Sequence, residues 1–193
     1  QNFNIASTAG STYTIGNVKN GTFHYNGTAS LAGNGSLING KDSAVLLDTG
    51  STLVSTGDNT IGAVLEGQYN SVLPGGFTVG IDAENRGTMT FGNSSAGLYG
   101  SNGTRLKNIG SISLGDSSMG LHTNGSGSYA LNDGSIALGS LSVGIYGQNS
   151  SNLENLLNGV ITGSGRETVG IYGEGSAPLV IANDGRIELN GDK

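Results

Sequence analysis

The chain has 193 residues, a formal net charge of −6 and only 11% charged residues. Its 36 glycines far exceed the usual share but follow no G-X-Y period, which excludes collagen. The sequence has no cysteine and no cluster of Lys and Arg, which excludes a disulfide framework or thiolate metal site and argues against a nucleic-acid partner.

Hydrophobic residues make up 35% of the chain, and Val, Ile and Leu recur at regular intervals, which indicates an ordered core. Cysteine-free chains rich in Asn, Ser, Thr and Gly are typical of exported bacterial surface proteins. The sequence contains neither a signal peptide nor an apolar run of membrane-spanning length. We therefore expect a mature or excised segment of an exported protein.

The first part of the chain alternates apolar and polar residues without matching the later pattern. The apolar residues of this part are Phe3, Ile5, Tyr13, Ile15, Phe23 and Tyr25. The first coil of a solenoid needs protection for its unpaired edge and core. We predict a divergent N-terminal cap over residues 1–30, followed by coils over 31–193 that are truncated at the C-terminus.

One short apolar segment then recurs along the chain. Its third position is expected to face the core, and these positions lie 16 to 26 residues apart: Leu46, Leu65, Ile81, Leu98, Leu121, Ile145 and Ile171. A fixed period of this length is the signature of a solenoid, in which each copy is one coil. The spacing predicts seven coils whose length grows toward the C-terminus.

Each later coil is predicted to hold about three short strands, which makes the fold an all-β parallel β-helix. One strand follows a glycine and alternates apolar and polar residues, as in 88–91, 111–114, 135–138, 160–162 and 186–189. The next is the recurring segment. The last, less regular strand is expected at 105–108, 128–131, 156–158 and 178–181.

An asparagine closes each coil, one or two residues before a glycine. These residues are Asn85, Asn108, Asn132, Asn158 and Asn183. Asn–Gly pairs favour the positive φ values of sharp turns. In a stack the asparagines lie above one another at strand spacing, where their amides hydrogen-bond along the column. We assign them a structural role.

The recurring segment also predicts an outward face. If its first and third residues point inward, its glycine and its fourth residue point outward. The fourth positions read Leu47, Glu66, Asp82, Tyr99, His122, Tyr146 and Tyr172, beside glycines 80, 97, 120, 144 and 170.

Three interpretations of this face are open. The aromatic residues stack on one another and stabilise the coils. Alternatively, Tyr99, His122, Tyr146 and Tyr172, with Gly97, Gly120, Gly144 and Gly170, form a flat strip that binds a partner. A third possibility is that the glycines admit another backbone or loop of the full-length protein.

No catalytic, metal or cofactor site is predicted. Glu66 and Asp82 are neighbours in the outward column, but glycoside chemistry needs a paired carboxylate arrangement that two aligned acids do not establish. His24 and His122 lie far apart and have no further ligands at metal-binding spacing. No P-loop, Rossmann or nucleophile-elbow motif occurs.

Two segments, 68–77 and 148–154, interrupt the repeat and are expected to form loops. Insertions on a solenoid commonly cluster on one face and carry binding. They are also tolerated as plain surface excursions, and both interpretations stay open.

The stretch from Asn132 to Gly147 reads N-D-G-S-I-A-L-G-S-L-S-V-G-I-Y-G. It resembles the repeats of Gram-negative autotransporter (type V secretion) passenger domains, especially the large fusobacterial-type outer-membrane adhesins. The resemblance implies a right-handed parallel β-helix and anchoring through a C-terminal membrane barrel that is missing from this sequence. It also implies a cell-surface location and adhesion to cells. We expect a non-enzymatic chain that attaches to a protein or glycan receptor on host cells or other bacteria. The alternative is a polysaccharide-processing or tailspike-like β-helix enzyme, with an acidic cluster around Glu66 and Asp82.

Overall fold

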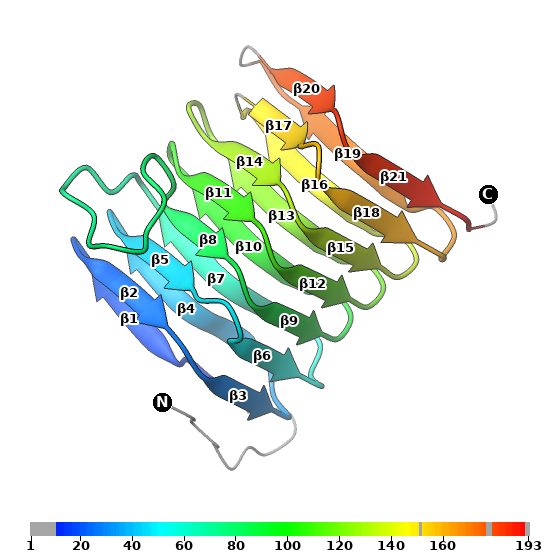
Figure 1. Cartoon of the computed structure of the whole chain (residues 1–193). Helices are drawn as coiled ribbons and strands as arrows, with labels where there is room; N and C mark the ends of the chain where they lie inside the picture. The colour runs from blue at the N-terminus through cyan, green and yellow to red at the C-terminus, as the bar shows by residue number, and fades with distance from the viewer. Residues whose placement is uncertain (1–10, 151, 177–178, 192–193) are drawn as a thin grey trace.

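The structure, a computed structural model, describes residues 11–150, 152–176 and 179–191. These residues are all-β: they form twenty-one short strands and no helix. The strands make three seven-stranded parallel sheets, and each coil contributes one strand to each sheet (Figure 1). The chain is therefore a β-solenoid of about seven coils with three strands per coil, as predicted.

Three sheets form the three walls of the solenoid. Sheet 1 contains β1 (Gly16–Lys19), β4 (Gly35–Lys41), β7 (Thr60–Glu66), β10 (Ala96–Ser101), β13 (Met119–Asn124), β16 (Val143–Gln148) and β19 (Val169–Glu174). Sheet 2 contains β2 (Thr22–Tyr25), β5 (Ala44–Leu47), β8 (Ala83–Asn85), β11 (Arg105–Asn108), β14 (Tyr129–Asn132), β17 (Asn152–Asn155) and β20 (Val180–Asn183). Sheet 3 contains β3 (Thr28–Leu31), β6 (Thr52–Ser55), β9 (Thr88–Phe91), β12 (Ser111–Leu114), β15 (Ser135–Leu138), β18 (Val160–Gly163) and β21 (Arg186–Leu189).

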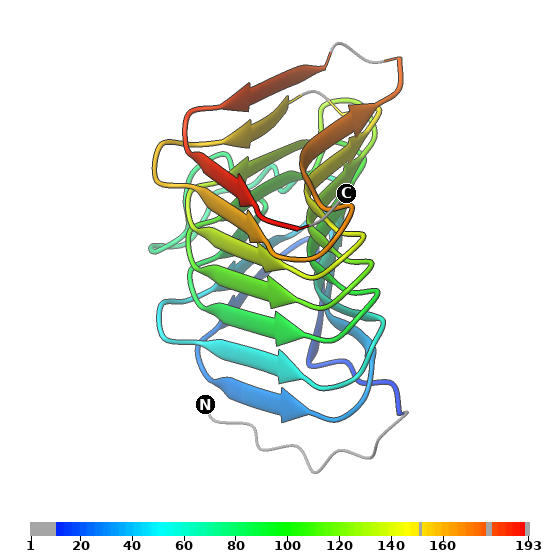
Figure 2. The ribbon, with the colours of Figure 1, turned by 90° about the vertical axis from the view of Figure 1, so that its right-hand side faces the viewer.

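The coils wind in the right-handed sense. In Figure 2 the stack rises from the N-terminal coils at the bottom, and the strands on the near side run from left to right. Parallel strands within one sheet are connected in this sense in nearly all proteins, because of the right-handed twist of strands.

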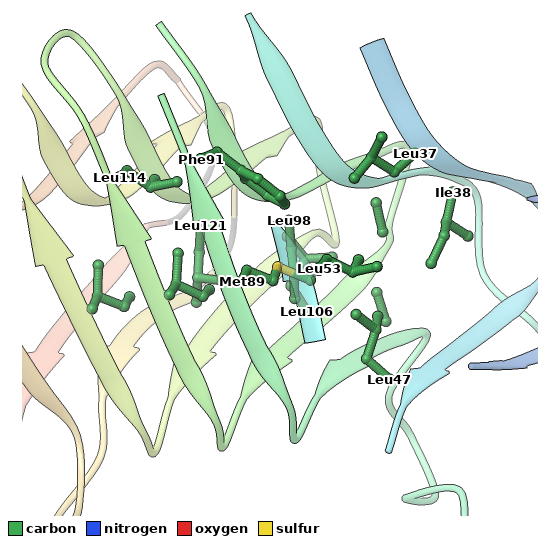
Figure 3. Close-up of a cluster of buried hydrophobic side chains, with 14 of the residues drawn as sticks. Leu37, Ile38, Leu47, Leu53, Met89, Phe91, Leu98, Leu106, Leu114 and Leu121 are labelled. Carbon is green, nitrogen blue, oxygen red and sulfur yellow. The ribbon is translucent and has the colours of Figure 1, made fainter. Parts of the chain in front are cut away.

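The core is a set of apolar columns, one or two from each sheet. Residues at equivalent inward positions pair in register from coil to coil, so identical or similar side chains stack at about 4.8 Å spacing. Fully buried members include Leu98, Leu106, Met89 and Leu121 (Figure 3). Ile136 is also fully buried. Burial of these side chains is the main favourable term in the folding of such a stack.

The coil architecture begins inside the predicted cap. Residues 16–31 form β1, β2 and β3, which pair in register with β4, β5 and β6. Phe23 and Tyr25 point inward from β2, and Tyr13 and Ile15 pack against the same core. The predicted cap boundary at residue 30 therefore falls within β3, the last strand of the first coil, while residues 1–10 lie outside the described part of the chain.

The predicted register of the early coils is wrong. Residues 44–47 form β5, which belongs to sheet 2. Ala63, rather than Leu65, pairs with Leu98, and residues 79–82 form no strand. A short apolar run suits any inward strand, so the pairing between coils, and not the run itself, decides which sheet it joins.

Coil length does not grow steadily along the stack. Paired residues of sheet 1 are 22 to 26 residues apart in five of the six steps, but 35 residues separate Ala63 from Leu98. The additional residues form the β7–β8 loop, residues 67–82. The second predicted insertion, 148–154, is wrong in its extent, because Gln148 belongs to β16 and residues 152–154 belong to β17.

Candidate functional site

The outer face of sheet 1 carries an aromatic column: Tyr99, His122, Tyr146 and Tyr172. These residues pair in register across β10, β13, β16 and β19, as predicted. The ring centroids lie 4.7 Å apart for Tyr99 and His122, 4.8 Å for His122 and Tyr146, and 5.7 Å for Tyr146 and Tyr172. The first pair is edge-on and the last is stacked, which are the favoured arrangements of aromatic pairs.

The C-terminal end of the aromatic column is its most polar and most exposed part. The Tyr146 hydroxyl donates to the Glu174 Oε1 atom at 2.6 Å, and the Gln148 amide donates to the same oxygen at 3.3 Å. The hydrogen bond to the carboxylate raises the pKa of Tyr146 to about 12. Tyr172, 46% exposed, is the outermost ring. A hydroxyl, a carboxylate and an amide therefore lie beside exposed aromatic surface.

His122 lies between two tyrosine rings and is half-buried. Its Nε2 atom is inaccessible to solvent and has no hydrogen-bond partner. Burial lowers the pKa of His122 below its ordinary value of 6.5, because the charged form loses hydration. The ring is therefore neutral near pH 7 and acts as an aromatic member of the column.

The predicted outward glycine strip is wrong. Gly97, Gly120, Gly144 and Gly170 are buried, and a Cβ on each would point at a core isoleucine of sheet 3. At Gly120 it would lie 2.7 Å from the Ile136 side chain and 2.5 Å from the Gly144 carbonyl oxygen. Both the glycine and the following apolar residue face inward, so the simple alternation assumed from the sequence is interrupted there.

The same interruption of the alternation turns the first residue of the recurring segment outward. The sequence interpretation placed Val143 in the core, but it is only half-buried and precedes an inward glycine. It belongs to an outer apolar column of paired residues: Ile61, Ala96, Met119, Val143 and Val169. An outer polar column lies on the other side of the rings: Glu66, Ser101, Asn124, Gln148 and Glu174.

The early members of the predicted outward column are also wrong. The residues in register before Tyr99 are Val64, Asn39 and Asn17, in place of Asp82, Glu66 and Leu47. The side chains become smaller toward the N-terminus. The face is shallowly hollowed there, beside Asn17, Lys19, Lys41, Val64 and Glu66.

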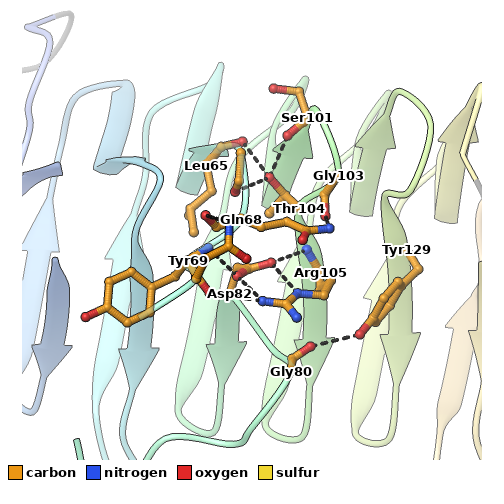
Figure 4. A network of polar contacts seen from close by, with 12 residues as sticks. Leu65, Gln68, Tyr69, Gly80, Asp82, Ser101, Gly103, Thr104, Arg105 and Tyr129 are labelled. Atoms are coloured by element: carbon orange, nitrogen blue, oxygen red, sulfur yellow. Dashed lines mark hydrogen bonds and ion pairs between the residues drawn. The ribbon is translucent and has the colours of Figure 1, made fainter. Parts of the chain in front are cut away.

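Glu66 and Asp82 serve separate ion pairs. Glu66 is exposed and lies 3.3 Å from Lys41. The fully buried Asp82 carboxylate accepts two 2.7 Å bonds from the Arg105 guanidinium and further bonds from the backbone N–H groups of Arg105 and Tyr69 (Figure 4). Among the described residues, no group of three or more His, Asp or Glu side chains is placed to hold a metal ion.

The asparagine column is confirmed, with one change of member. Asn85, Asn108, Asn132 and Asn155 are buried, and each donates its side-chain amide to the next asparagine at 2.8 Å, ending on Asn183. The predicted member Asn158 is wrong: it is exposed and donates to Asp133. Strands β11, β14 and β17 share the pattern x-apolar-x-Asn, a signal that identifies Asn155.

The glycines after the asparagine column serve close packing rather than positive φ. Gly87, Gly110, Gly134 and Gly185 lack positive φ, but a Cβ on Gly110 would lie 2.0 Å from the Gly87 carbonyl oxygen of the preceding coil. The positive φ values occur mainly in the other two turns of the coil. In the turn between sheets 1 and 2 at least one residue per coil adopts them: Asn20, Asp42, Gly67, Asn102, Gly125, Asn149 and Gly175. In the turn between sheets 3 and 1 they are adopted by Asn59, Ser94, Ser117, Leu141 and Glu167.

No family model, curated protein or solved structure matches the chain. The described residues also contain no helix long and apolar enough to cross a membrane.

Proposed function

We propose that the chain is a passenger segment of a cell-surface adhesin, in which the β-solenoid holds a binding face for a receptor on host cells or other bacteria. The observation that carries the proposal is the aromatic column, which stays in register over four coils on the outer face of sheet 1. The cell-surface location and the outer-membrane anchoring are parts of the same proposal, and both rest on the resemblance of residues 132–147 to autotransporter passenger repeats.

The composition of the face supports contact with a receptor. An outer apolar column, the aromatic column and an outer polar column lie side by side over β10, β13, β16 and β19. Apolar surface supplies binding energy when it is covered, and flanking polar groups fix the orientation of the bound molecule. Most ring faces already contact a neighbouring ring, so a receptor meets ring edges and the polar groups around Glu174.

The geometry of the acids favours a scaffold over an enzyme. Asp82 is enclosed by Arg105 and two backbone donors, and Glu66 is paired with Lys41 on the surface. We therefore propose no reaction for this chain. The direct check is an assay of polysaccharide depolymerisation by the purified protein and its Glu66→Gln variant. Depolymerisation that is lost in the variant would overturn the non-enzymatic proposal.

The binding proposal is tested by a double variant, Tyr146→Ser with Tyr172→Ser. Binding of the labelled protein to epithelial cells, to co-aggregating bacteria and to a glycan array is measured beside Thr88→Ala with Thr90→Ala, which changes two exposed residues on sheet 3. We expect at least about tenfold weaker binding for the tyrosine variant and wild-type binding for the sheet 3 variant. Equal binding by all three proteins, with unchanged circular dichroism, would refute the assignment of this face.

A further inference from the structure

The β7–β8 loop, residues 67–82, is the one large departure from the repeat in the described part of the chain. It folds back over the outer face of sheet 2, beside β5 and β8 (Figure 1). Leu46 and Glu84 occupy outward positions of these strands and are nevertheless buried. In the same outward column, Lys107 and Leu131 lie beyond the loop and are half-buried. The loop is therefore packed against the solenoid.

Both ends of the loop are held by specific polar contacts. Near its start, the Tyr69 N–H donates to Asp82 and the Gln68 amide donates to the Gly103 carbonyl at 2.7 Å. At its end, Asp82 receives the two guanidinium bonds of Arg105, and the Tyr129 hydroxyl donates to the Gly80 carbonyl at 2.8 Å (Figure 4). Bidentate Arg–carboxylate pairs of this kind fix geometry as well as supply energy.

A second ion pair holds the C-terminal part of the β7–β8 loop. Glu84 is buried and lies 2.7 Å from the Arg86 guanidinium, which also donates to the Thr78 hydroxyl at 3.1 Å. The Phe77 ring lies edge-on to His24, with centroids 6.1 Å apart. Two buried acids, Asp82 and Glu84, and two arginines thus hold the β7–β8 loop. The other coils that the structure describes connect sheets 1 and 2 without such a loop.

The surface of the β7–β8 loop is uncharged and carries two exposed valines. Residues 67–81 contain no Asp, Glu, Lys or Arg. Val72 is 93% exposed and Val79 is 88% exposed, the highest values for large hydrophobic side chains among the described residues. Exposed apolar side chains on a pre-organised segment are typical of contact sites, because little conformational entropy is lost on binding.

We infer that the β7–β8 loop is a protein-docking protrusion, in which Val72 and Val79 are covered by uncharged apolar surface of a partner protein. Branched aliphatic side chains gain from burial against such a surface but offer no hydrogen bonds or ring faces to a sugar. A membrane surface is a poor occupant, because the loop has no basic residue and the chain has a net charge of −6. The inference rests on the proposed adhesin function and names a protein as the receptor for this site.

The closing experiment compares cell binding by the wild type, by Val72→Ser with Val79→Ser, and by Leu157→Ser. Leu157 is 79% exposed on another turn, which makes it a matched control. Epithelial cells and co-aggregating bacteria are used untreated, after protease treatment, or after periodate oxidation of their glycans. We expect the loop variant to bind at least about tenfold more weakly than the wild type and the control. We expect protease, but not periodate, to abolish the part of the cell binding that is lost in the loop variant.

Each other outcome has a distinct meaning. Binding by the loop variant equal to that of the wild type overturns this inference and leaves the adhesin proposal standing. Loop-dependent binding that survives protease and is lost after periodate assigns the loop to a glycan and also overturns it. Loop-dependent self-association in sedimentation would make a second copy of this chain the occupant, against the inference. A wild type that binds no cell overturns the adhesin proposal and the inference with it.

A measurement on the purified protein, without any receptor, tests whether the polar contacts at its ends hold the β7–β8 loop against the solenoid. Chymotrypsin can cut after Tyr69 and Phe77, so its rate reports how often the loop opens. We expect slow cutting of the wild type and at least about tenfold faster cutting of Arg105→Met, which removes the bidentate pair. Cutting of the wild-type loop as fast as that of a free peptide of residues 67–82 would overturn the inference.

Discussion

The asparagine column and the aromatic column repeat once per coil with similar strictness, but they differ in how much of their side-chain surface a partner could reach. Each buried asparagine amide bonds the next asparagine at 2.8 Å, and the column is enclosed by the coils. The aromatic column lies on an outer face, ends on an exposed Tyr172 and carries an unpartnered His122 nitrogen. Repetition alone therefore indicates stacking, while the position of the aromatic column on an outer face also leaves it within reach of a partner.

The strongest test of this contrast is Asn108→Ala. It removes two hydrogen bonds between side-chain amides. The buried Asn85 amide then lacks its acceptor in the asparagine column, and the buried Asn132 oxygen lacks its donor there. We expect the free energy of unfolding to fall by about 2 to 4 kcal/mol in urea denaturation. Asn158→Ala, at the exposed position, is the control and should change it by less than about 0.5 kcal/mol. A larger effect at Asn158 than at Asn108 would contradict the assignment of the column.

The next test concerns the glycines between the core and the aromatic column. In Gly120→Ala the new methyl group meets the Ile136 side chain and the Gly144 carbonyl, so we expect a loss of about 1 to 3 kcal/mol in the free energy of unfolding. Gly75→Ala, where a Cβ meets no atom within 4 Å, should change it by less than about 0.5 kcal/mol. A neutral Gly120→Ala would mean that this glycine does face solvent.

A smaller effect is expected from protonation of His122. Its pKa in the folded protein lies below the ordinary 6.5, so the unfolded chain binds this proton first as pH falls. The contribution to stability is present above pH 6.5 and is lost progressively below it. His122→Phe keeps a ring in the column and removes the titration. We expect the difference in unfolding free energy between wild type and variant to shift in favour of the variant below pH 6.5. A difference that is independent of pH would contradict the burial of His122.

The smallest expected effect concerns the hydrogen bond between Tyr146 and Glu174 at the C-terminal end of the aromatic column. Tyr146 has a pKa of about 12 because its hydroxyl donates to Glu174. The folded state thus keeps this group neutral above the usual value of 10.0, where the unfolded chain ionises. The contact stabilises the fold below pH 10 and is lost toward pH 12. Glu174→Gln should lower the pKa of Tyr146 toward 10, as measured by ultraviolet titration against Tyr146→Phe. No shift would show that Glu174 does not accept this bond.

Several features of the fold could be derived from residue patterns because they repeat locally. The alternation in 111–114 and 135–138 predicted the strands of sheet 3, and the spacing of the tyrosines predicted their register. The asparagines at 85, 108, 132 and 183 were assigned correctly for the same reason: the coils from β8 onward are nearly equal in length. Where one coil departs from that length, between Ala63 and Leu98, the same reasoning misplaced the register.

The candidate site was only half predictable. The aromatic column was found, but Met119, Val143 and Val169 were missed, because the glycine of the motif faces inward together with its neighbour and shifts the first residue outward. The base of the β7–β8 loop was missed too. Asp82 and Arg105 are 23 residues apart, and their pairing follows from the stacking of β11 against β8.

The period of the chain, its parallel coils and the identity of its stacked columns follow from the amino-acid sequence, since equivalent residues in a solenoid contact their own copies in the next coil. The direction in which each glycine points and the anchoring of the loop depend on the tertiary structure. These features depend on the distance between backbones of neighbouring coils and on partners that are remote in sequence, and a local pattern contains neither.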